Sequence, residues 1–414
     1  MKILYLHPRA WTGEYPVLAA LRDRGHQVCV LEEDRKLPAA RRLAADFERP
    51  GDGIATLWFN PRRGAERLLT WPWDRYYRRA FEGRNLAHRA WLVAAAARLF
   101  KPDVMVASDG FSYAVPAAWL RRQGKLAVPL VVSYIGGDIL DFPEAEVGKR
   151  RTPAVTRLIR DVIAAADLLR PVSPLVARTL LAEGAAESKL RICPSHLVAD
   201  AATLDAIFAA RDAIRARIRA ARGIAADAPT IVTLSGNLRG KGLHLLAEAW
   251  PHVLAAIPGA RWLLCGPADP WLAQAVWPRL EAAGVTASVQ VCGSLSGAAV
   301  FEHLAAADLH VNPSLGESLN MVTVEAAAVG TPTLGSDRAG IADWMQRHDA
   351  GIVVPAGEVG PLADAIIRAL GDPQRLAGWS RAGRGMAAEF ALERIAGQLE
   401  SLFEEARRAP SLEH

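Results

Sequence analysis

The stretch that decides the fold reads NPSLGESLNMVTVEAAAVGTP and spans residues 312–332. It follows a strand-like apolar run, passes through a loop rich in proline, serine and glycine, and continues as a helix that ends near Gly330. Glu317 lies in the loop and Glu325 lies eight positions later, on the helix. Two glutamates at this spacing are a weak pattern alone, because one cap and one solvated helix residue would look the same. The first N–H groups of such a helix suit an anionic or hydroxyl-rich ligand, and here they belong to Ser318, Leu319, Asn320 and Met321.

The same alternation of strand, loop and helix runs through both halves of the chain, which predicts parallel sheets covered by helices. Strands are expected at 2–6, 27–31, 103–107 and 129–133, and then at 230–235, 260–265, 288–292, 309–311, 331–335 and 351–354. We therefore expect an α/β protein with two Rossmann-like domains whose parallel sheets face each other across an interdomain cleft. The expected parts are an N-terminal Rossmann-like domain at 1–200, a linker region at 201–228, a C-terminal domain at 229–385 and a helix within 386–410 that returns toward the first domain.

A second motif follows the first strand of the second half and reads TLSGNLRGKG, residues 233–242. Glycines and two cations in a strand-to-helix loop can hold a phosphate through backbone N–H groups, the helix dipole and point charges. An ordinary basic turn would have the same composition. The spacing is not that of a Walker A loop, and the chain has no D-x-D triplet to carry a metal-bound diphosphate. After the first strand, residues 7–13 contain one glycine in place of G-x-G-x-x-G, which argues against a nicotinamide dehydrogenase.

Together these motifs resemble the family-4 retaining glycosyltransferases, glycosyl transferases group 1, which have the two-domain GT-B fold. Their second domain has a glycine-arginine-lysine loop, a P-S-x-x-E-x-x-G-x-x-x-x-E stretch and a G-x-P after it. The resemblance runs from Ile231 to about Leu370, and the first half matches in outline. It implies transfer of a hexosyl or N-acetylhexosaminyl group from a UDP- or GDP-sugar, with retention, without a metal and with no cofactor beyond this co-substrate.

The resemblance also implies roles for individual residues. Glu325 would bind the nucleotide ribose, and Glu317 would bind the donor-sugar hydroxyls as a catalytic residue. Arg239 and Lys241 would hold the diphosphate, and the backbone of Ser318–Met321 would close on sugar and phosphate. The other donor-site candidates are Gly236 and Asn237 in the loop, with Gly266 and Ser294 beside the base. Asn237 stands where the family usually has arginine, and Asn320 stands where it usually has glycine.

Candidates in the first half are fewer. Asp138 ends the run SYIGGD, residues 133–138, where many relatives place a histidine. It is our candidate for a first-domain catalytic carboxylate, with a helix-capping role as the alternative. His7 and Gly13 follow the first strand and are the acceptor-side candidates, although a structural histidine is the commoner outcome for His7.

The positive charge is concentrated in one region. The 414-residue chain has a net charge of +5, and residues 60–100 carry nine arginines against three acidic residues. Aromatic residues interleave with these arginines at 57–79, a mixture that suits an anionic membrane surface. It could also bind an acidic acceptor or contact a protein or nucleic acid, and the commonest outcome for such a mixture is that the aromatic residues pack into the domain core and the arginines form a solvated face. No apolar stretch reaches the roughly 18 residues of a membrane span, so we expect a cytoplasmic protein that this region could bring to the inner membrane surface.

The acceptor is expected to be a lipid-linked or cell-surface glycan precursor, and no nucleic acid is expected as a partner. Two other functions stay open. A GT-B epimerase or hydrolase of nucleotide sugars would consume the donor without an acceptor. A non-catalytic GT-B scaffold would bind a nucleotide sugar without turnover, an option that Asn237 and Asn320 keep open.

Overall fold

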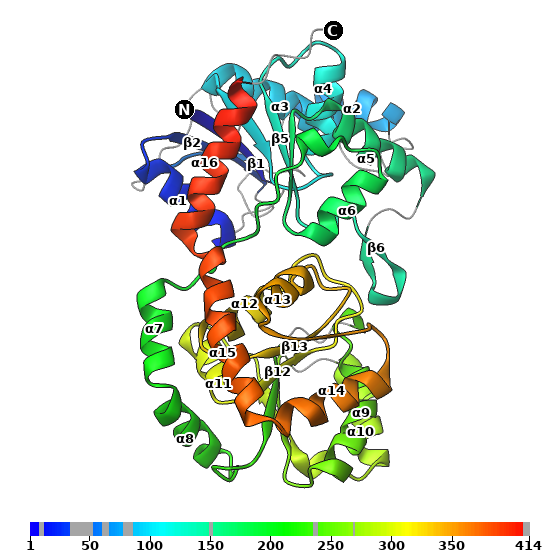
Figure 1. Cartoon of the computed structure of the whole chain (residues 1–414). Helices are drawn as coiled ribbons and strands as arrows, with labels where there is room; N and C mark the ends of the chain where they lie inside the picture. Colours follow the sequence, from blue (N-terminus) through cyan, green and yellow to red (C-terminus); the bar gives the residue numbers. More distant parts are fainter. Residues whose placement is uncertain are drawn as a thin grey trace. The chain divides into compact units, whose positions relative to one another are not determined.

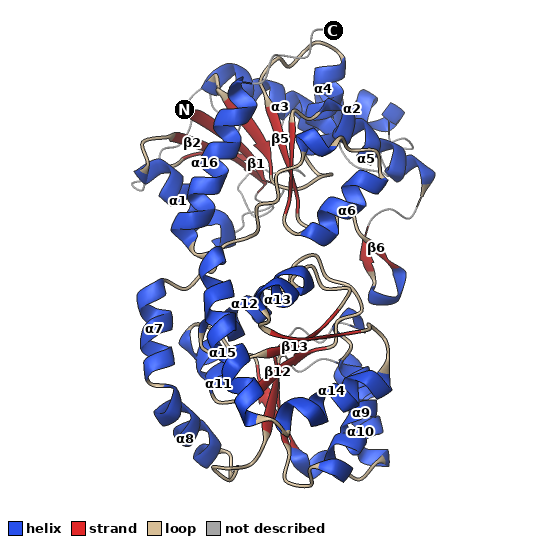
Figure 2. Ribbon diagram, viewed as in Figure 1, coloured by secondary structure: helices blue, strands red, loops and turns tan. Residues whose placement is uncertain are grey.

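The computed structural model describes residues 1–7, 12–33, 53–59, 66–77, 86–148, 152–234, 239–267 and 270–408. The chain divides into two compact units, each with its own parallel sheet covered by helices (Figures 1 and 2). The first unit comprises Met1–Asp141, Gly148–Val198 and Leu392–His414, and the second comprises Phe142–Val147 and Ala199–Ala391. Parallel strands that helices cover on both faces are nearly continuous apolar runs in the sequence. These runs supply the core of each unit.

The first unit is built on a six-stranded sheet in the order β3-β2-β1-β4-β5-β8, with every pair parallel. The strands are β1 (Lys2–His7), β2 (Gln27–Glu33), β3 (Ala55–Phe59), β4 (Val104–Ala107), β5 (Leu130–Tyr134) and β8 (Leu168–Pro171). Four of them lie where strands were expected, while β3 and β8 were not among the expected strands. The helices are α1 (Tyr15–Asp23), α2 (Glu66–Tyr77), α3 (Leu86–Phe100), α4 (Ala114–Arg122), α5 (Pro153–Ala165), α6 (Pro174–Ala182) and α16 (Leu392–Arg408).

The last helix of the chain, α16, packs in the first unit. Its apolar side chains recur at helical spacing and join the core cluster of β1, β2 and α1. Phe403 meets the ring of Tyr5 edge-on, with 6.0 Å between ring centroids. Beside this contact, Arg24 forms ion pairs with Glu400 at 3.0 Å and with Glu393 at 3.2 Å. These contacts tie the end of the chain to its first strands.

The second unit has a six-stranded parallel sheet in the order β11-β10-β9-β12-β13-β14. Its strands are β9 (Thr230–Leu234), β10 (Arg261–Cys265), β11 (Val289–Gly293), β12 (Leu309–Asn312), β13 (Thr333–Ser336) and β14 (Gly351–Val354), each at an expected position. The buried indoles of Trp250 and Trp262 pack with ring centroids 5.8 Å apart. Covering helices are α9 (Leu243–Ala256), α10 (Trp277–Ala282), α11 (Ala298–Ala305), α12 (Met321–Ala328), α13 (Ala342–His348), α14 (Val359–Leu370) and α15 (Pro373–Ala387).

The region expected as a linker, 201–228, forms two helices of the second unit, α7 (Ala201–Ala209) and α8 (Arg211–Ala221). Arg219 is fully buried, pairs with Asp308 at 2.9 Å and donates to the carbonyl oxygens of Ala306 and Ala228. A charged, alanine-rich sequence looks like a solvated connector. Here the buried guanidinium instead satisfies carbonyl groups next to β9 and β12.

Candidate functional site

The two motifs of the second unit meet at the carboxyl ends of neighbouring strands. The glycine-rich loop leaves β9 and continues as a short 3₁₀ turn, η4 (Arg239–Lys241), while the loop after β12 leads to α12. Ser314 Oγ and the Leu315 N–H both donate to the carbonyl oxygen of Gly240, at 2.9 and 2.8 Å. The two motifs are about 75 residues apart in the sequence. They meet in one site because the strands that precede them, β9 and β12, are adjacent in the sheet.

Lys241 and Glu317 form an ion pair in this site. Lys241 Nζ lies 2.5 Å from Glu317 Oε1, and both side chains keep roughly a fifth to a quarter of their surface exposed. The other carboxylate oxygen, Oε2, is buried and makes no hydrogen bond to the described residues. The Glu317 N–H donates to Arg338 O at 3.0 Å, and the Gly340 N–H donates to Glu317 O at 2.9 Å. The two backbone hydrogen bonds fix Glu317 in the loop, and Lys241 binds one oxygen of its carboxylate. The other oxygen keeps its capacity to accept a hydrogen bond from a ligand.

Asn320 adopts a backbone conformation that explains its place in the motif. Its φ is +80°, in the left-handed region that favours glycine. Asparagine tolerates that region better than most residues. Its side-chain oxygen accepts a hydrogen bond from the Thr323 N–H at 3.1 Å, which makes Asn320 the N-cap of α12. The asparagine therefore keeps the loop geometry of a glycine and adds a helix cap.

Burial shifts the pKa values of two groups near this loop. Burial raises the pKa of Glu325, on α12, to about 7. Burial, with the positive charge of Lys241 adding to it, lowers the pKa of His310 on β12 to about 3. His310 is therefore neutral, and its Nδ1 lies 3.1 Å from Thr333 Oγ1. Glu325, by contrast, is poised to change charge when a hydrogen-bond donor binds it.

Two glycines let the loops approach each other. Gly242 has a φ of +70°, and a Cβ there would lie 2.0 Å from the carbonyl oxygen of Pro313. A Cβ on Gly240 would lie 2.4 Å from the carbonyl oxygen of Ala145, in the Phe142–Val147 segment of the second unit. That segment is held by an ion pair between Glu144 and Arg338. A side chain larger than hydrogen at either position would therefore push the glycine-rich loop away from its neighbours.

The remaining donor-site candidates lie in three places. Gly236 and Asn237 lie outside the described residues. Arg239 begins η4 and its side chain is exposed. The Gly266 N–H donates to Gly293 O at 3.0 Å, which joins the carboxyl ends of β10 and β11, and Ser294 follows directly. Gly266 and Ser294 therefore lie at the same edge of the sheet as the Lys241–Glu317 pair, one and two strands along from β9.

In the first unit, Asp138 links two loops at the carboxyl ends of β4 and β5. Its carboxylate accepts hydrogen bonds from the Gly110 N–H at 2.6 Å, the Gly136 N–H at 2.8 Å and the Ile135 N–H at 3.3 Å. The side chain is fully buried, and burial together with the charge of Asp109 raises its pKa to about 6. These contacts give Asp138 a positioning role, and a direct catalytic role for it stays a prediction.

The acceptor-side candidates lie at the end of β1. Gly13 lies in a short turn, η1 (Thr12–Glu14), and His7 Nε2 lies 3.5 Å from Glu14 Oε2.

Sequence reasoning missed Arg170, which is buried at the end of β8. Its guanidinium donates to the carbonyl oxygens of Cys193 and Pro194 at 3.0 and 2.9 Å. The signal was an arginine inside an otherwise apolar run, which only a buried polar partner can stabilise.

Among the described residues, no helix is both long enough and apolar enough to cross a membrane.

Two family models match the chain one after the other. The model described as "Glycosyl transferase 4-like domain" matches residues 15–196, and "Glycosyl transferases group 1" matches residues 228–372.

Curated proteins similar to this chain come from different bacteria. The GDP-mannose-dependent alpha-(1-6)-phosphatidylinositol monomannoside mannosyltransferase of Mycobacterium tuberculosis is 26% identical over 298 residues, which cover 70% of this chain and 73% of that protein. A Salmonella typhimurium protein that is named for colanic acid biosynthesis as glycosyltransferase WcaL is 26% identical over 415 residues, or 94% of each chain.

Solved structures share the fold over the whole chain. Sucrose-phosphate synthase from Thermosynechococcus elongatus has a TM-score of 0.74 at 20% identity, covering 99% of this chain and 100% of that one. HepE of Anabaena, in complex with UDP, has a TM-score of 0.73 at 19% identity, covering 98% and 100%. At these identities the likeness shows the fold.

Proposed function

The chain belongs to the group 1 glycosyltransferases and has the GT-B fold, and on that premise we propose a specific reaction for it. It transfers a hexosyl or N-acetylhexosaminyl group from a GDP- or UDP-sugar to a hydroxyl of a lipid-linked or cell-surface glycan. The configuration at the anomeric carbon is retained, and no metal takes part.

The Lys241–Glu317 ion pair is the observation that carries this proposal. A diphosphate would compete with Glu317 for the ammonium group of Lys241, because it brings more negative charge. Glu317 would then accept hydrogen bonds from hydroxyls of the donor sugar, and its buried Oε2 is already without a partner among the described residues. Arg239 supplies a second cation for the diphosphate, and Glu325 on α12 accepts hydrogen bonds from the ribose hydroxyls.

In the proposed reaction, the bond between the anomeric carbon and the diphosphate oxygen breaks while the acceptor oxygen bonds to the same face of that carbon. The acceptor proton passes to an oxygen of the leaving phosphate. Lys241 and Arg239 stabilise the charge that develops on this phosphate, which is the work that a metal does in other transferases.

The relatives support the choice of donor and acceptor. The mycobacterial relative is named for GDP-mannose and a phosphatidylinositol mannoside, and the Salmonella relative is named for a polysaccharide. HepE was solved with UDP. We therefore place GDP-mannose first among the donors, UDP-sugars second, and a glycolipid first among the acceptors.

The proposal is tested first by calorimetry of GDP, UDP, ADP and dTDP binding to the purified protein in the presence of a chelator. We expect one of the first two to bind. Transfer is then measured with the matching radiolabelled nucleotide sugar and a bacterial lipid extract, with products separated by chromatography. Hydrolysis without an acceptor would instead identify an epimerase or hydrolase, and binding without turnover would identify a scaffold.

Two variants and a control locate the site. Glu325→Ala is expected to weaken nucleotide binding, whereas Glu317→Ala is expected to slow transfer with nucleotide binding retained. Glu281→Ala, which changes an exposed glutamate of the same unit, is the control and should behave like the parent. The proposed site would be wrong if both site variants bound and turned over like the parent.

A further inference from the structure

Helix α2 of the first unit exposes four large apolar side chains. Its exposed apolar side chains are Leu68 at 79%, Trp71 at 58%, Trp73 at 59% and Tyr76 at 76% of their surface. Among the side chains of α2 whose burial the structure describes, the buried ones are Thr70 and Asp74, and both are polar. A helix of a globular protein normally buries its apolar face, and contiguous exposed apolar surface usually marks an interaction site.

The buried face of α2 has a structural task that fixes this orientation. Asp74 Oδ1 accepts hydrogen bonds from the N–H groups of Ala87 at 2.8 Å and His88 at 3.4 Å, in the first turn of α3. A carboxylate at the N-terminus of a helix is favoured by the helix dipole. Asp74 anchors α2 on α3 through this cap, so the aromatic residues on the other side of α2 stay exposed.

The charged side chain that the structure describes on the exposed face of α2, Arg75, is positive. The guanidinium of Arg75 is exposed and lies 5.7 Å from the ring centroid of Trp71. The acidic neighbour, Asp74, is buried in the cap of α3 and does not lie on this face. The surrounding sequence, residues 60–100, has nine arginines against three acidic residues. The face therefore complements an anionic partner.

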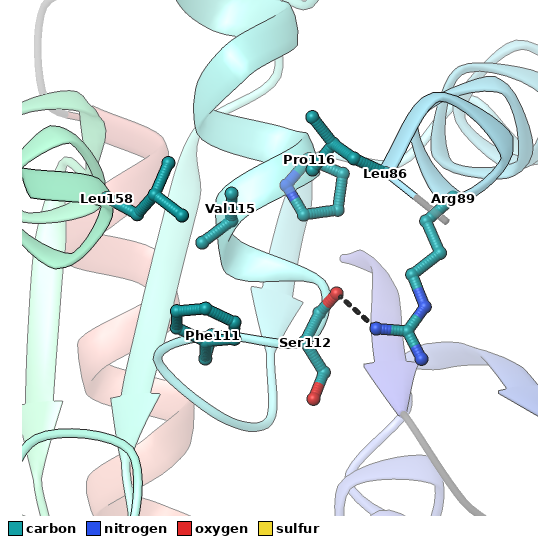
Figure 3. Close-up of a pocket in the computed structure, with 7 residues that line it drawn as sticks. All are labelled: Leu86, Arg89, Phe111, Ser112, Val115, Pro116 and Leu158. Atoms are coloured by element: carbon teal, nitrogen blue, oxygen red, sulfur yellow. Dashed lines mark hydrogen bonds between the residues drawn. The ribbon is translucent and has the colours of Figure 1, made fainter. Parts of the chain in front are cut away.

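A small apolar hollow lies next to the anchored turn of α3 (Figure 3). Leu86 and Arg89, on either side of the two residues that Asp74 caps, both line it. Arg89 turns to the edge, where its guanidinium donates to Ser112 O at 3.0 Å. The other lining residues are Ser112, Phe111, Val115, Pro116 and Leu158. An apolar hollow edged by an arginine has the same chemistry as the α2 face, apolar surface next to positive charge.

We propose that the exposed face of α2, formed by Leu68, Trp71, Trp73, Arg75 and Tyr76, docks on the surface of an anionic lipid bilayer. Indole and phenol rings favour the boundary between lipid headgroups and acyl chains, because one part of the ring is apolar and another part hydrogen-bonds to water. Arginine binds lipid phosphate at the same depth. The inference rests on the proposed function for its purpose, the delivery of a lipid-linked acceptor.

The test measures vesicle binding, which needs no transfer, so it can fail independently of the proposed function. The full-length protein is sedimented with sucrose-loaded vesicles of phosphatidylcholine, or of equal parts phosphatidylcholine and phosphatidylglycerol. We expect binding to the anionic vesicles and little to the neutral ones. Trp71→Ser with Trp73→Ser should weaken binding about tenfold or more, and Arg75→Glu should weaken it about fivefold or more.

The control is a double variant, Leu181→Ser with Val198→Ser, which removes two exposed apolar side chains of the same unit away from α2. It should bind vesicles like the parent. Since the altered side chains are exposed, every variant should keep its thermal unfolding midpoint, which is checked by circular dichroism. Absence of binding to anionic vesicles, or equal binding by the parent and the tryptophan variant, would overturn the proposal and leave an acidic protein or glycan as the partner of this face.

Discussion

The affinity for a nucleotide sugar should depend on pH through Glu325. Burial raises the pKa of this carboxyl from its ordinary 4.5 to about 7. Hydroxyl groups that donate to the carboxylate stabilise its ionised form, so ribose binding should return the pKa toward its ordinary value. Binding then requires loss of the proton, and the affinity should rise as the pH is raised past the pKa of the free protein.

The size of the effect follows from the two pKa values. With a free pKa of about 7, roughly a tenth of Glu325 is ionised at about pH 6 and roughly nine-tenths at about pH 8. The affinity should therefore rise about tenfold over this interval, and about half a proton should be released per ligand near pH 7. A nucleotide sugar is the right ligand, because its diphosphate, esterified at both ends, has no group that titrates in this range.

The assay is isothermal titration calorimetry at both pH values and in two buffers of different ionisation enthalpy, which reports the released protons. Glu325→Gln is the matched variant, since it keeps the shape and removes the titration. In this variant the affinity should be low and equal at the two pH values. Equal affinity of the parent at both pH values, or a pH dependence that persists in Glu325→Gln, would refute the reasoning.

The raised pKa of Glu325 also makes the free energy of unfolding depend on pH. An acid whose pKa is raised on folding binds its proton more tightly when folded. The contribution of Glu325 to the stability of the second unit should therefore be most favourable below about pH 4.5, and it should fall by up to about 3 kcal/mol as the pH rises to about 7 and above. Glu325→Gln avoids that cost, so it should raise the thermal unfolding midpoint at pH 8 while it weakens donor binding.

Three further predictions concern the loops. Gly242→Ala should abolish donor binding because its Cβ would collide with Pro313, whereas Gly284→Ala, with a similar positive φ and open space, should cost only about 1 kcal/mol in thermal unfolding and bind normally. Asp138→Ala should destabilise the first unit by about 2 kcal/mol because three loop N–H groups lose their acceptor. Asp138→Asn should cost less, since it keeps an acceptor oxygen; equal melting of the two variants would contradict the positioning role. Lys241→Gln should lower kcat about a hundredfold with a smaller change in KM, and an unchanged kcat would exclude Lys241 from phosphate stabilisation.

Much of the second unit could be predicted from the sequence. Each of its six strands is a short apolar run bounded by glycine, proline or polar residues, so its position is a local property. The family resemblance, carried by residues 231–370, is confirmed by two family models that match consecutive parts of the chain. The strands β3 and β8 were missed because one is isolated among arginines and aromatics and the other contains Arg170, a charged residue that a short apolar pattern excludes.

The sequence by itself determined the alternation of strands and helices, the two glutamates and two cations of the donor loops, and the concentration of arginine and tryptophan before α3. These are properties of residue type and spacing, which local conformation and solvation control. The pairing of Lys241 with Glu317, the raised pKa of Glu325 and the outward aromatic face of α2 depend on what lies beside each group in space. Those neighbours come from distant parts of the chain and are brought together by strand order, so only the tertiary structure decided them.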